Sequence, residues 1–286
     1  MIGLRNKLQT GVQTVIQSMH RLIITKGSKP MPITRPCYLT VRQFAGGYYT
    51  GNNQDGYIKD PSYSTTPQNY IRAFEILQKD LVALFESIEP ADQNLRAYSF
   101  RTHELLMRAC IELEANFKAI LAANTYSRPG NLNLTDYFKI NKSHYLSEYE
   151  VRLPYWTGTK SIWKPFEAWR INAASASPHT LTWYSAYNAA KHDRAGELVQ
   201  ANLENLLYAV TGLEVVLSAQ YFIHDFGPVN YLVRSDAYDG FQIGLGGYLS
   251  VKFPQNIPQA ERYDFAWSTL ASQGGQVFDK FDYDRV

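Results

Sequence analysis

The stretch AGELVQANLENLLYAVTGLEVVLSAQYF, residues 195–222, carries the longest continuous apolar pattern in the chain. Its apolar residues recur at steps of three and four: Val199, Leu203, Leu206, Val210, Leu213 and Leu217. This spacing places them on one face of an α-helix, and the alternation of three and four is typical of helices packed in bundles. The stretch therefore predicts a long helix whose apolar face needs helical partners.

Two earlier segments show the same periodicity. The first begins at Thr66, a typical N-cap residue, and Pro67, a typical first helical residue, and we expect Pro90 to end it. The second begins after Ser99, and Pro129–Gly130 is expected to end it. The link between them is short, which predicts an antiparallel helical hairpin.

The rest of the chain is turn-rich, and we divide it around these helices. Residues 1–66 are expected to form an amphipathic segment (Leu4, Leu8, Val12, Val15, Ile16 and Met19) and a turn-rich arm with short strands around residues 38–44. Residues 67–223 are expected to form the helical bundle, with an aromatic insert at 131–178. Residues 224–286 read as an irregular extension packed on the bundle, with two short strands around a Gly246–Gly247 turn.

The predicted fold is therefore mainly α: an antiparallel four-helix bundle with an irregular aromatic insert and short β or irregular terminal segments. The insert is too apolar for a solvated linker, so we expect it to pack on the bundle and shape a groove. Its Tyr155, Trp156, Trp163, Phe166 and Trp169 would offer stacking surfaces there, although tryptophans more often fill cores.

Composition narrows the classes of function. The net charge of +2 is too small to predict nucleic-acid binding from the overall field, while 21 tyrosines among 286 residues favour half-buried surfaces and interfaces. No apolar run approaches the ~20 residues that cross a bilayer, so we expect no membrane association. The two cysteines, Cys37 and Cys110, are far apart, which favours a reduced, cytoplasmic compartment.

Familiar catalytic motifs are absent from the sequence, and we expect no cofactor or metal. The Gly244–Gly247 run lacks the strand and helix that flank a phosphate-binding loop. The segment that begins at His103 resembles the start of a zinc-protease helix, but the position four residues later is Met107.

The stretch WYSAYNAAKHDR, residues 183–194, contains the strongest candidate site. If it is helical, Tyr184, Asn188 and His192 share one face, and Trp183 and Tyr187 share the adjacent one. The three aromatic residues would then form a ligand-binding wall.

The same stretch has the parts for proton transfer to a phosphodiester. His192 offers an imidazole, Asn188 an amide to orient it, and Lys191 a cation for the developing charge. Arg194 lies about 200° around the helix from His192 and joins it only if the chain kinks near Asp193 or a second subunit supplies it. The alternative is a hydrogen-bonded histidine that only orders the bundle.

A row of charged residues on the second predicted helix, Arg101, Glu104 and Arg108, allows two interpretations. The row can be a solvated face with weak ion pairs. If the insert covers it, the same residues become the floor of a binding site.

The paired helices, the aromatic insert and the sequence YNAAKHDR, which would open the last long helix, resemble the HEPN superfamily of small helical-bundle domains. The nearer resemblance is to uncharacterised bacterial proteins with a Tyr-Asn-x-x-Lys-His-x-Arg stretch, over residues 67–222. In catalytically active HEPN domains, the resemblance implies metal-independent RNA cleavage, usually at a site completed across a homodimer.

This chain departs from the catalytic pattern. Where the resemblance places an arginine ahead of His192, the sequence has Tyr187, Ala186 and Ser185. The pair Arg96 and His103 has a permitted spacing, but it lies on another helix and one such pair is expected by chance.

Three functions follow from these observations. The favoured one is a non-catalytic HEPN-like protein that binds a nucleotide, an RNA or a protein partner through an aromatic groove. The second is a metal-independent endoribonuclease, a toxin or defence component, that uses His192. The third is a structural or interaction protein without a ligand.

Overall fold

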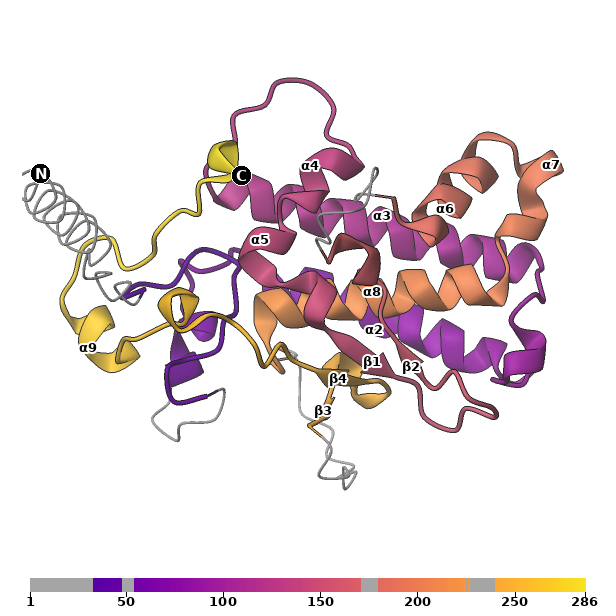
Figure 1. Cartoon of the computed structure of the whole chain (residues 1–286), viewed down its shortest axis with the longest axis horizontal. Helices are drawn as coiled ribbons and strands as arrows, with labels where there is room; N and C mark the ends of the chain where they lie inside the picture. The colour runs from indigo at the N-terminus through magenta and orange to yellow at the C-terminus, as the bar shows by residue number, and fades with distance from the viewer. Residues whose placement is uncertain (1–32, 48–53, 171–179, 225, 227–239) are drawn as a thin grey trace, which may run out of the picture.

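The computed structural model describes residues 33–47, 54–170, 180–224, 226 and 240–286. The chain is mainly helical, and it carries a small antiparallel sheet (Figure 1). The amphipathic segment that we predicted near the N-terminus lies outside the described residues, as does the end of the insert.

Helix α2 (Pro67–Leu84) begins where the sequence predicts, with Pro67 at its first position. Thr66 occupies the N-cap position, but its side chain makes no capping hydrogen bond. The helix ends before Pro90, because its last turn tightens: the N–H groups of Glu86 and Ser87 donate to carbonyl groups three residues earlier.

Helix α3 (Phe100–Ala123) begins with a capping box, in which Ser99 Oγ accepts from Thr102 N at 3.1 Å and Thr102 Oγ1 accepts from Ser99 N at 2.7 Å. It ends at Ala123, six residues before the predicted Pro129–Gly130 stop. Asn124 turns the chain away, since its Nδ2 donates to Tyr38 O at 3.0 Å and its Oδ1 accepts from Phe281 N at 2.9 Å.

Helix α8 (Leu203–Tyr221) is the long helix that the opening stretch predicts, and Asn202 caps it. Only Glu204, Asn205 and Tyr208 escape full burial, so α8 is apolar all around rather than along one stripe. Val199 does not belong to it and is 49% exposed.

Helix α6 (Thr182–His192) and helix α7 (Arg194–Glu197) precede α8. We expected the sequence YNAAKHDR to open the last long helix. This expectation is wrong, because the sequence lies at the end of a separate helix. The chain breaks at Asp193, whose φ of −134° and ψ of 78° are not helical, and a second interruption at residues 198–202 separates α7 from α8.

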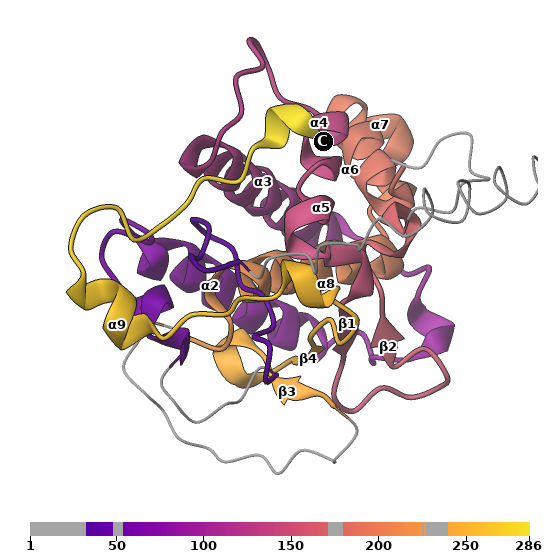
Figure 2. The same cartoon turned by 60° about the vertical axis from the view of Figure 1, so that its left-hand side comes forward.

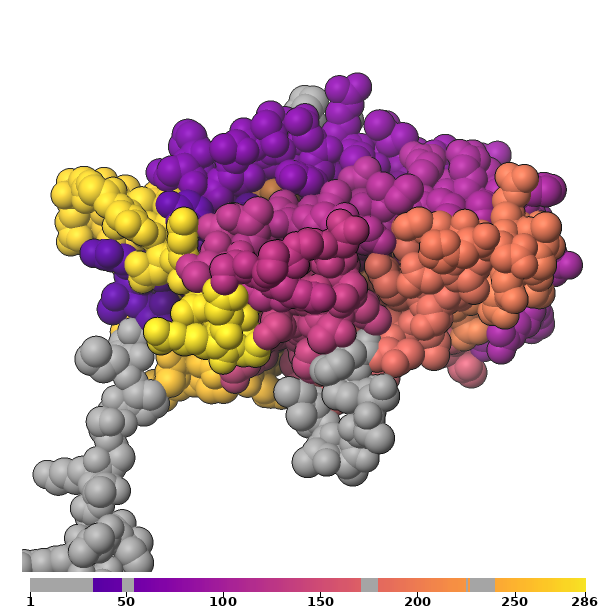
Figure 3. Space-filling model, turned by 90° about the horizontal axis from the view of Figure 1, so that it is seen from above, coloured from indigo at the N-terminus to yellow at the C-terminus, as the bar shows by residue number. Residues whose placement is uncertain are grey.

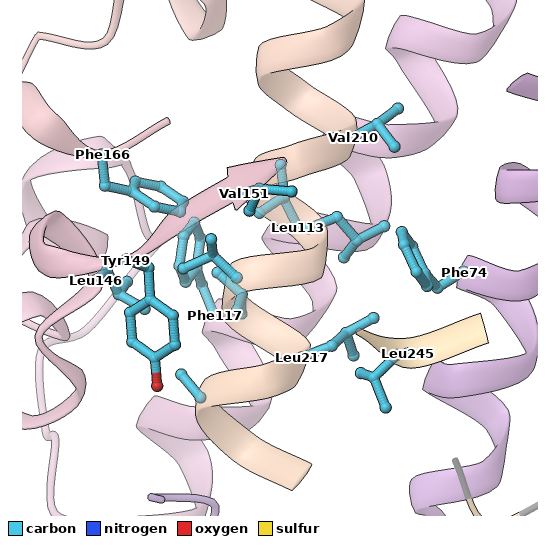
Figure 4. Close-up of a cluster of buried hydrophobic side chains, with 14 of the residues drawn as sticks. Phe74, Leu113, Phe117, Leu146, Tyr149, Val151, Phe166, Val210, Leu217 and Leu245 are labelled. Carbon is cyan, nitrogen blue, oxygen red and sulfur yellow. The ribbon is translucent and has the colours of Figure 1, made fainter. Parts of the chain in front are cut away.

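Helices α2, α3, α6 and α8 pack on one another, and α3 and α8 share the most extensive contact. The largest buried cluster joins these helices to the insert and to the C-terminal segment (Figure 4). Its labelled members are Phe74, Leu113, Phe117, Leu146, Tyr149, Val151, Phe166, Val210, Leu217 and Leu245.

The sheet lies on one side of the helices, as the two views in Figures 1 and 2 show. Its strand order is β2 (Ile162–Trp163), β1 (Glu150–Arg152), β4 (Ser250–Lys252), β3 (Gln242–Ile243), all antiparallel. Val151 lies opposite both Trp163 and Val251, so the insert and the C-terminal segment share one sheet. The predicted strand pair around Gly246–Gly247 is confirmed.

The short strands expected around residues 38–44 do not form. Among the described residues of that segment there are only isolated bridges, such as Phe44 with Tyr263. The backbone of this segment bonds to several different partners, including Val41 N to Ala219 O at 2.8 Å at the end of α8, and so makes no continuous ladder. Elsewhere the chain forms the short helices α4 (Leu134–Phe138), α5 (Asn141–His144) and α9 (Trp267–Ser272).

Candidate functional site at the end of helix α6

The inner face of α6 is buried. Trp183 Nε1 donates to Pro165 O at 2.9 Å, and Tyr184 OH donates to Glu114 Oε1, also at 2.9 Å. Tyr187 is buried beside them. A buried ring cannot stack on a ligand, so these three residues anchor α6 and do not form the ligand-binding wall that the sequence suggested.

Burial raises the pKa of both Tyr184 and Tyr187, and the carboxyl group of Glu114 adds to each shift. Both hydroxyl groups therefore stay neutral and act as hydrogen-bond donors or acceptors. The Lys191 ammonium lies 3.2 Å from Tyr187 OH, at the border between the buried face and the exposed end of the helix.

The described part of the insert does line a cavity of about 660 Å³, where Phe138 and Tyr145 contribute rings. The five aromatic residues that we expected to form stacking surfaces are not among its lining residues. Trp163, Phe166 and Trp169 are fully buried and belong to the core. Trp156 is partly buried, and its Nε1 donates to Asp92 Oδ1 at 2.7 Å. Of the five aromatic residues considered there, only Tyr155 is widely exposed, at 85%.

The last turn of α6 is exposed. Lys191 and His192 both face solvent, and Asn188 one turn earlier is half-buried. The helix stops because Asp193 leaves the helical conformation and its Oδ1 accepts from Gly196 N at 2.9 Å, which caps α7. In a continuous helix Arg194 would lie on the side of α6 away from His192. The break at Asp193 is the kink that we expected to release Arg194 from that position.

Arg194 is the first residue of α7, and its guanidinium lies 5.7 Å from the centre of the Phe100 ring. Phe100 is the first residue of α3 and is 68% exposed. His103, one turn further, has its Nε2 3.4 Å from Ala190 O. The start of α3 and the end of α6 therefore lie side by side.

The segment before α3 joins the same region. Residues 95 and 97 accept hydrogen bonds from the first residues of α8, with Leu203 N to Ala97 O at 2.8 Å. This pairing leaves Arg96 and Tyr98 exposed, with Arg96 beside α6 and Tyr98 bridged to Asn202, just before α8. We call this region the α6 end surface and define it by Arg96, Tyr98, Phe100, Lys191, His192 and Arg194. Figure 3 shows α6 and α7, in orange, at the right-hand end of the molecule.

Two of the acidic groups near this surface are already engaged. Asp193 caps α7, and Glu204 lies 3.7 Å from the Arg96 guanidinium and also binds Lys160. By contrast, Arg194 contacts an aromatic ring and Lys191 a tyrosine hydroxyl. The cations of Arg194 and Lys191 are therefore open to an anionic ligand.

The charged row on α3 binds α2. Arg101 Nη2 lies 2.8 Å from Asp80 Oδ1, Arg101 Nη1 lies 2.8 Å from Glu104 Oε2, and Arg108 also pairs with Asp80. The Arg108 guanidinium is the main cause of the lowered pKa of Asp80. No described residue of the insert takes part in these ion pairs, so Arg101, Glu104 and Arg108 match the interpretation as a solvated, ion-paired face.

Sequence reasoning missed Tyr98 and Phe100 and discounted Arg96. The signal was present: Tyr98 and Phe100 flank the capping residue Ser99 and fall outside the apolar stripe of α3. Aromatic residues that belong to no stripe have no predicted place in the core, and this marks them as candidates for an exposed surface.

Within the described residues, no group of three or more His, Cys, Asp or Glu side chains is placed to hold a metal ion. No helix in the same part of the chain is both long and apolar enough to span a membrane. No protein-family model, curated protein or solved structure matches the chain.

Proposed function

We propose that this chain is a HEPN-like helical protein that binds single-stranded RNA at the α6 end surface and does not cleave it. The observation that carries the proposal is the contact between Arg194 and the exposed Phe100 ring, with Lys191 nearby. Exposed aromatic rings interleaved with cations are the usual platform for single strands, because bases stack on the rings and phosphates bind the cations.

Four members of the surface would make the main contacts with RNA. Phe100 and Tyr98, 68% and 51% exposed, would stack on bases. Arg194 and Lys191 would bind phosphate oxygens, and the guanidinium of Arg194 would also stack on a base plane. The number of cations fits a short contact of a few nucleotides, which agrees with the small net charge of the chain.

The surroundings of His192 favour binding over catalysis. Catalytic imidazoles are often oriented by a second group. Among the described residues, none makes a hydrogen bond to the His192 ring, and the half-buried Asn188 makes none that would orient it. We therefore place His192 at the binding surface, with no role in bond cleavage.

The HEPN resemblance extends the proposal to the fold and the assembly. Helices α2, α3, α6 and α8 would be the four helices of the bundle, and the chain would form a homodimer. Equilibrium sedimentation tests the assembly: the proposal expects about twice the chain mass of 32.6 kDa. A mass of one chain at micromolar concentration would remove the homodimer from the proposal.

Fluorescence anisotropy with a labelled single-stranded RNA of about ten nucleotides tests the binding function. Phe100→Ala should weaken the affinity about tenfold, because stacking contributes ~1–3 kcal/mol per base. The matched control is Tyr155→Ala, which removes an exposed ring from the insert and should leave the affinity unchanged. Equal affinities for the wild type and both variants would contradict the proposal.

Incubation of the same RNA with the protein in EDTA tests for cleavage. We expect intact RNA with both the wild type and His192→Ala, and a weaker affinity for the variant. Cleavage that disappears in His192→Ala would instead establish the ribonuclease alternative.

A further inference from the structure

A cavity of about 570 Å³ lies between α6 and the start of α8. Its α6 wall is made of small residues at steps of three and four, which leave the space open: Thr182, Ser185, Ala186 and Ala189. Its other wall carries larger polar side chains: Gln200, Glu204, Asn205 and Tyr208. Arg96 lines it too and belongs to the α6 end surface, so the cavity adjoins that surface.

The charged groups around the cavity neutralise one another. The Glu204 carboxylate pairs with Lys160 and lies 3.7 Å from the Arg96 guanidinium. The Arg96 side chain is 83% exposed and therefore well solvated. The cavity offers no desolvated, unpaired charge to an ionic ligand.

The start of α8 gives an anion no backbone donors. Helix N-termini bind phosphate through free N–H groups, but the first three N–H groups of α8 all have partners. These are Leu203 N with Ala97 O at 2.8 Å, Glu204 N with Leu95 O at 2.9 Å, and Asn205 N with Asn202 Oδ1 at 3.1 Å. At the start of α8 the cavity therefore favours a neutral, polar ligand. The first turn of α6, which lines the cavity at Thr182 and has no side-chain cap, offers backbone N–H groups to the same ligand.

We infer that this cavity binds a neutral nucleobase through the hydroxyl groups of Thr182 and Ser185 and the amide of Gln200. Within the described part of the chain these three side chains make no hydrogen bond, so their donors and acceptors can meet a base edge. The volume suits a nucleoside. The choice of a base over other neutral molecules rests on the proposed RNA-binding function, because Arg96 joins the cavity to that surface.

Calorimetric titration of the full chain with adenosine, guanosine, cytidine and uridine tests the inference. At least one nucleoside should bind with one site per chain, and ribose 5-phosphate, which has no base, should not bind. Absence of heat and of saturation for all four nucleosides at millimolar concentration would overturn the inference.

Variants locate the site. Ser185→Leu adds bulk at an exposed helical position that lines the cavity, so it should weaken nucleoside binding at least tenfold. Gln200→Ala removes one hydrogen bond and should weaken nucleoside binding about fivefold. The matched control, Ala122→Leu, adds bulk at an exposed position near the other end of α3 and should change nothing. Circular dichroism verifies that each variant is folded, and nucleoside binding unaffected by Ser185→Leu would refute the assigned site.

The two proposals fail in different ways. RNA binding that depends on Phe100, without any nucleoside binding, would keep the proposed function and refute the cavity assignment. Nucleoside binding that Ser185→Leu blocks, without any RNA binding, would keep the cavity and refute the proposed function.

Discussion

Glu214 on α8 is fully buried, and its carboxyl group holds the C-terminal turn at residues 244–247. Its Oε1 accepts from Leu245 N at 2.8 Å and from Ser218 Oγ at 3.3 Å, while its Oε2 has no partner among the described residues. Burial raises the pKa of this carboxyl from 4.5 to about 8. Glu214 is therefore mostly protonated in the folded protein at pH 7.

This raised pKa predicts a pH-dependent stability. The unfolded chain loses the Glu214 proton near pH 4.5 and the folded chain only near pH 8, so the stabilisation is complete below 4.5 and is lost as the pH rises to about 8. The slope is at most about 1.4 kcal/mol per pH unit. Urea unfolding of the wild type and of Glu214→Gln between pH 5 and 8 measures this pH dependence. As the pH rises, the free energy of unfolding of Glu214→Gln should increase relative to that of the wild type. A constant difference would contradict the assignment.

Gly244 leaves the space that the Glu214 carboxyl occupies. A Cβ on residue 244 would overlap Glu214 Oε1 and would lie 3.0 Å from Leu249 O. Gly244→Ala should therefore lower the free energy of unfolding by about 1–3 kcal/mol, the usual cost of overpacking. Thermal unfolding at constant pH measures this, and an unchanged melting temperature would show that the turn is not held in this way.

For individual residues, the sequence predicts which of them share a helical face but does not predict their burial. Tyr184, Asn188 and His192 are aligned as expected, yet the first is buried, the second is half-buried and the third is exposed. The burial of Tyr184 depends on contacts such as Glu114, which α3 brings to α6. Periodicity within α6 contains no information about them.

Helix α8 is the central element of the fold, and Gly212 lies within it. A Cβ added there would meet Phe166 Cζ and Pro165 Cβ at 3.5 Å and Trp183 Cη2 at 3.6 Å, which are ordinary contacts. Because alanine is favoured over glycine in a helix by about 1 kcal/mol, Gly212→Ala should stabilise the protein by up to this amount. Thermal unfolding would show a higher melting temperature; a clear decrease would mean that the packing against α8 is tighter than described.

The long helices could be predicted from sequence because their apolar residues repeat at three and four over many turns. The boundary between α6 and α8 could not, since the apolar residues of 195–222 continue the helical spacing back to Val199, where the chain is no longer in α8. Of the strands in the sheet, the sequence predicted β3 and β4 but not β1 and β2. Strands of two or three residues are too short for a visible alternation, and β1 pairs with β4 about a hundred residues away.

In the whole molecule, the α6 end surface lies at the N-terminal end of α3. The C-terminal residues of the chain lie at the C-terminal end of α3. Thr125, just past α3, pairs with Asp282 near the C-terminus. Helix α3 has 24 residues and is therefore about 36 Å long. Cations at the C-terminal end, such as Lys280 and Arg285, are exposed and far from the α6 end surface, which makes them suitable controls.

The affinity for single-stranded RNA of two double variants, measured by anisotropy at several salt concentrations, tests the central claim most directly. Lys191→Ala with Arg194→Ala should weaken binding at least tenfold and reduce the slope of log affinity against log salt by about 1.4, the loss of two phosphate contacts. Lys280→Ala with Arg285→Ala removes the same charge and should leave both quantities unchanged. Equal losses in the two double variants, or no loss in either, would contradict an RNA-binding surface at the end of α6.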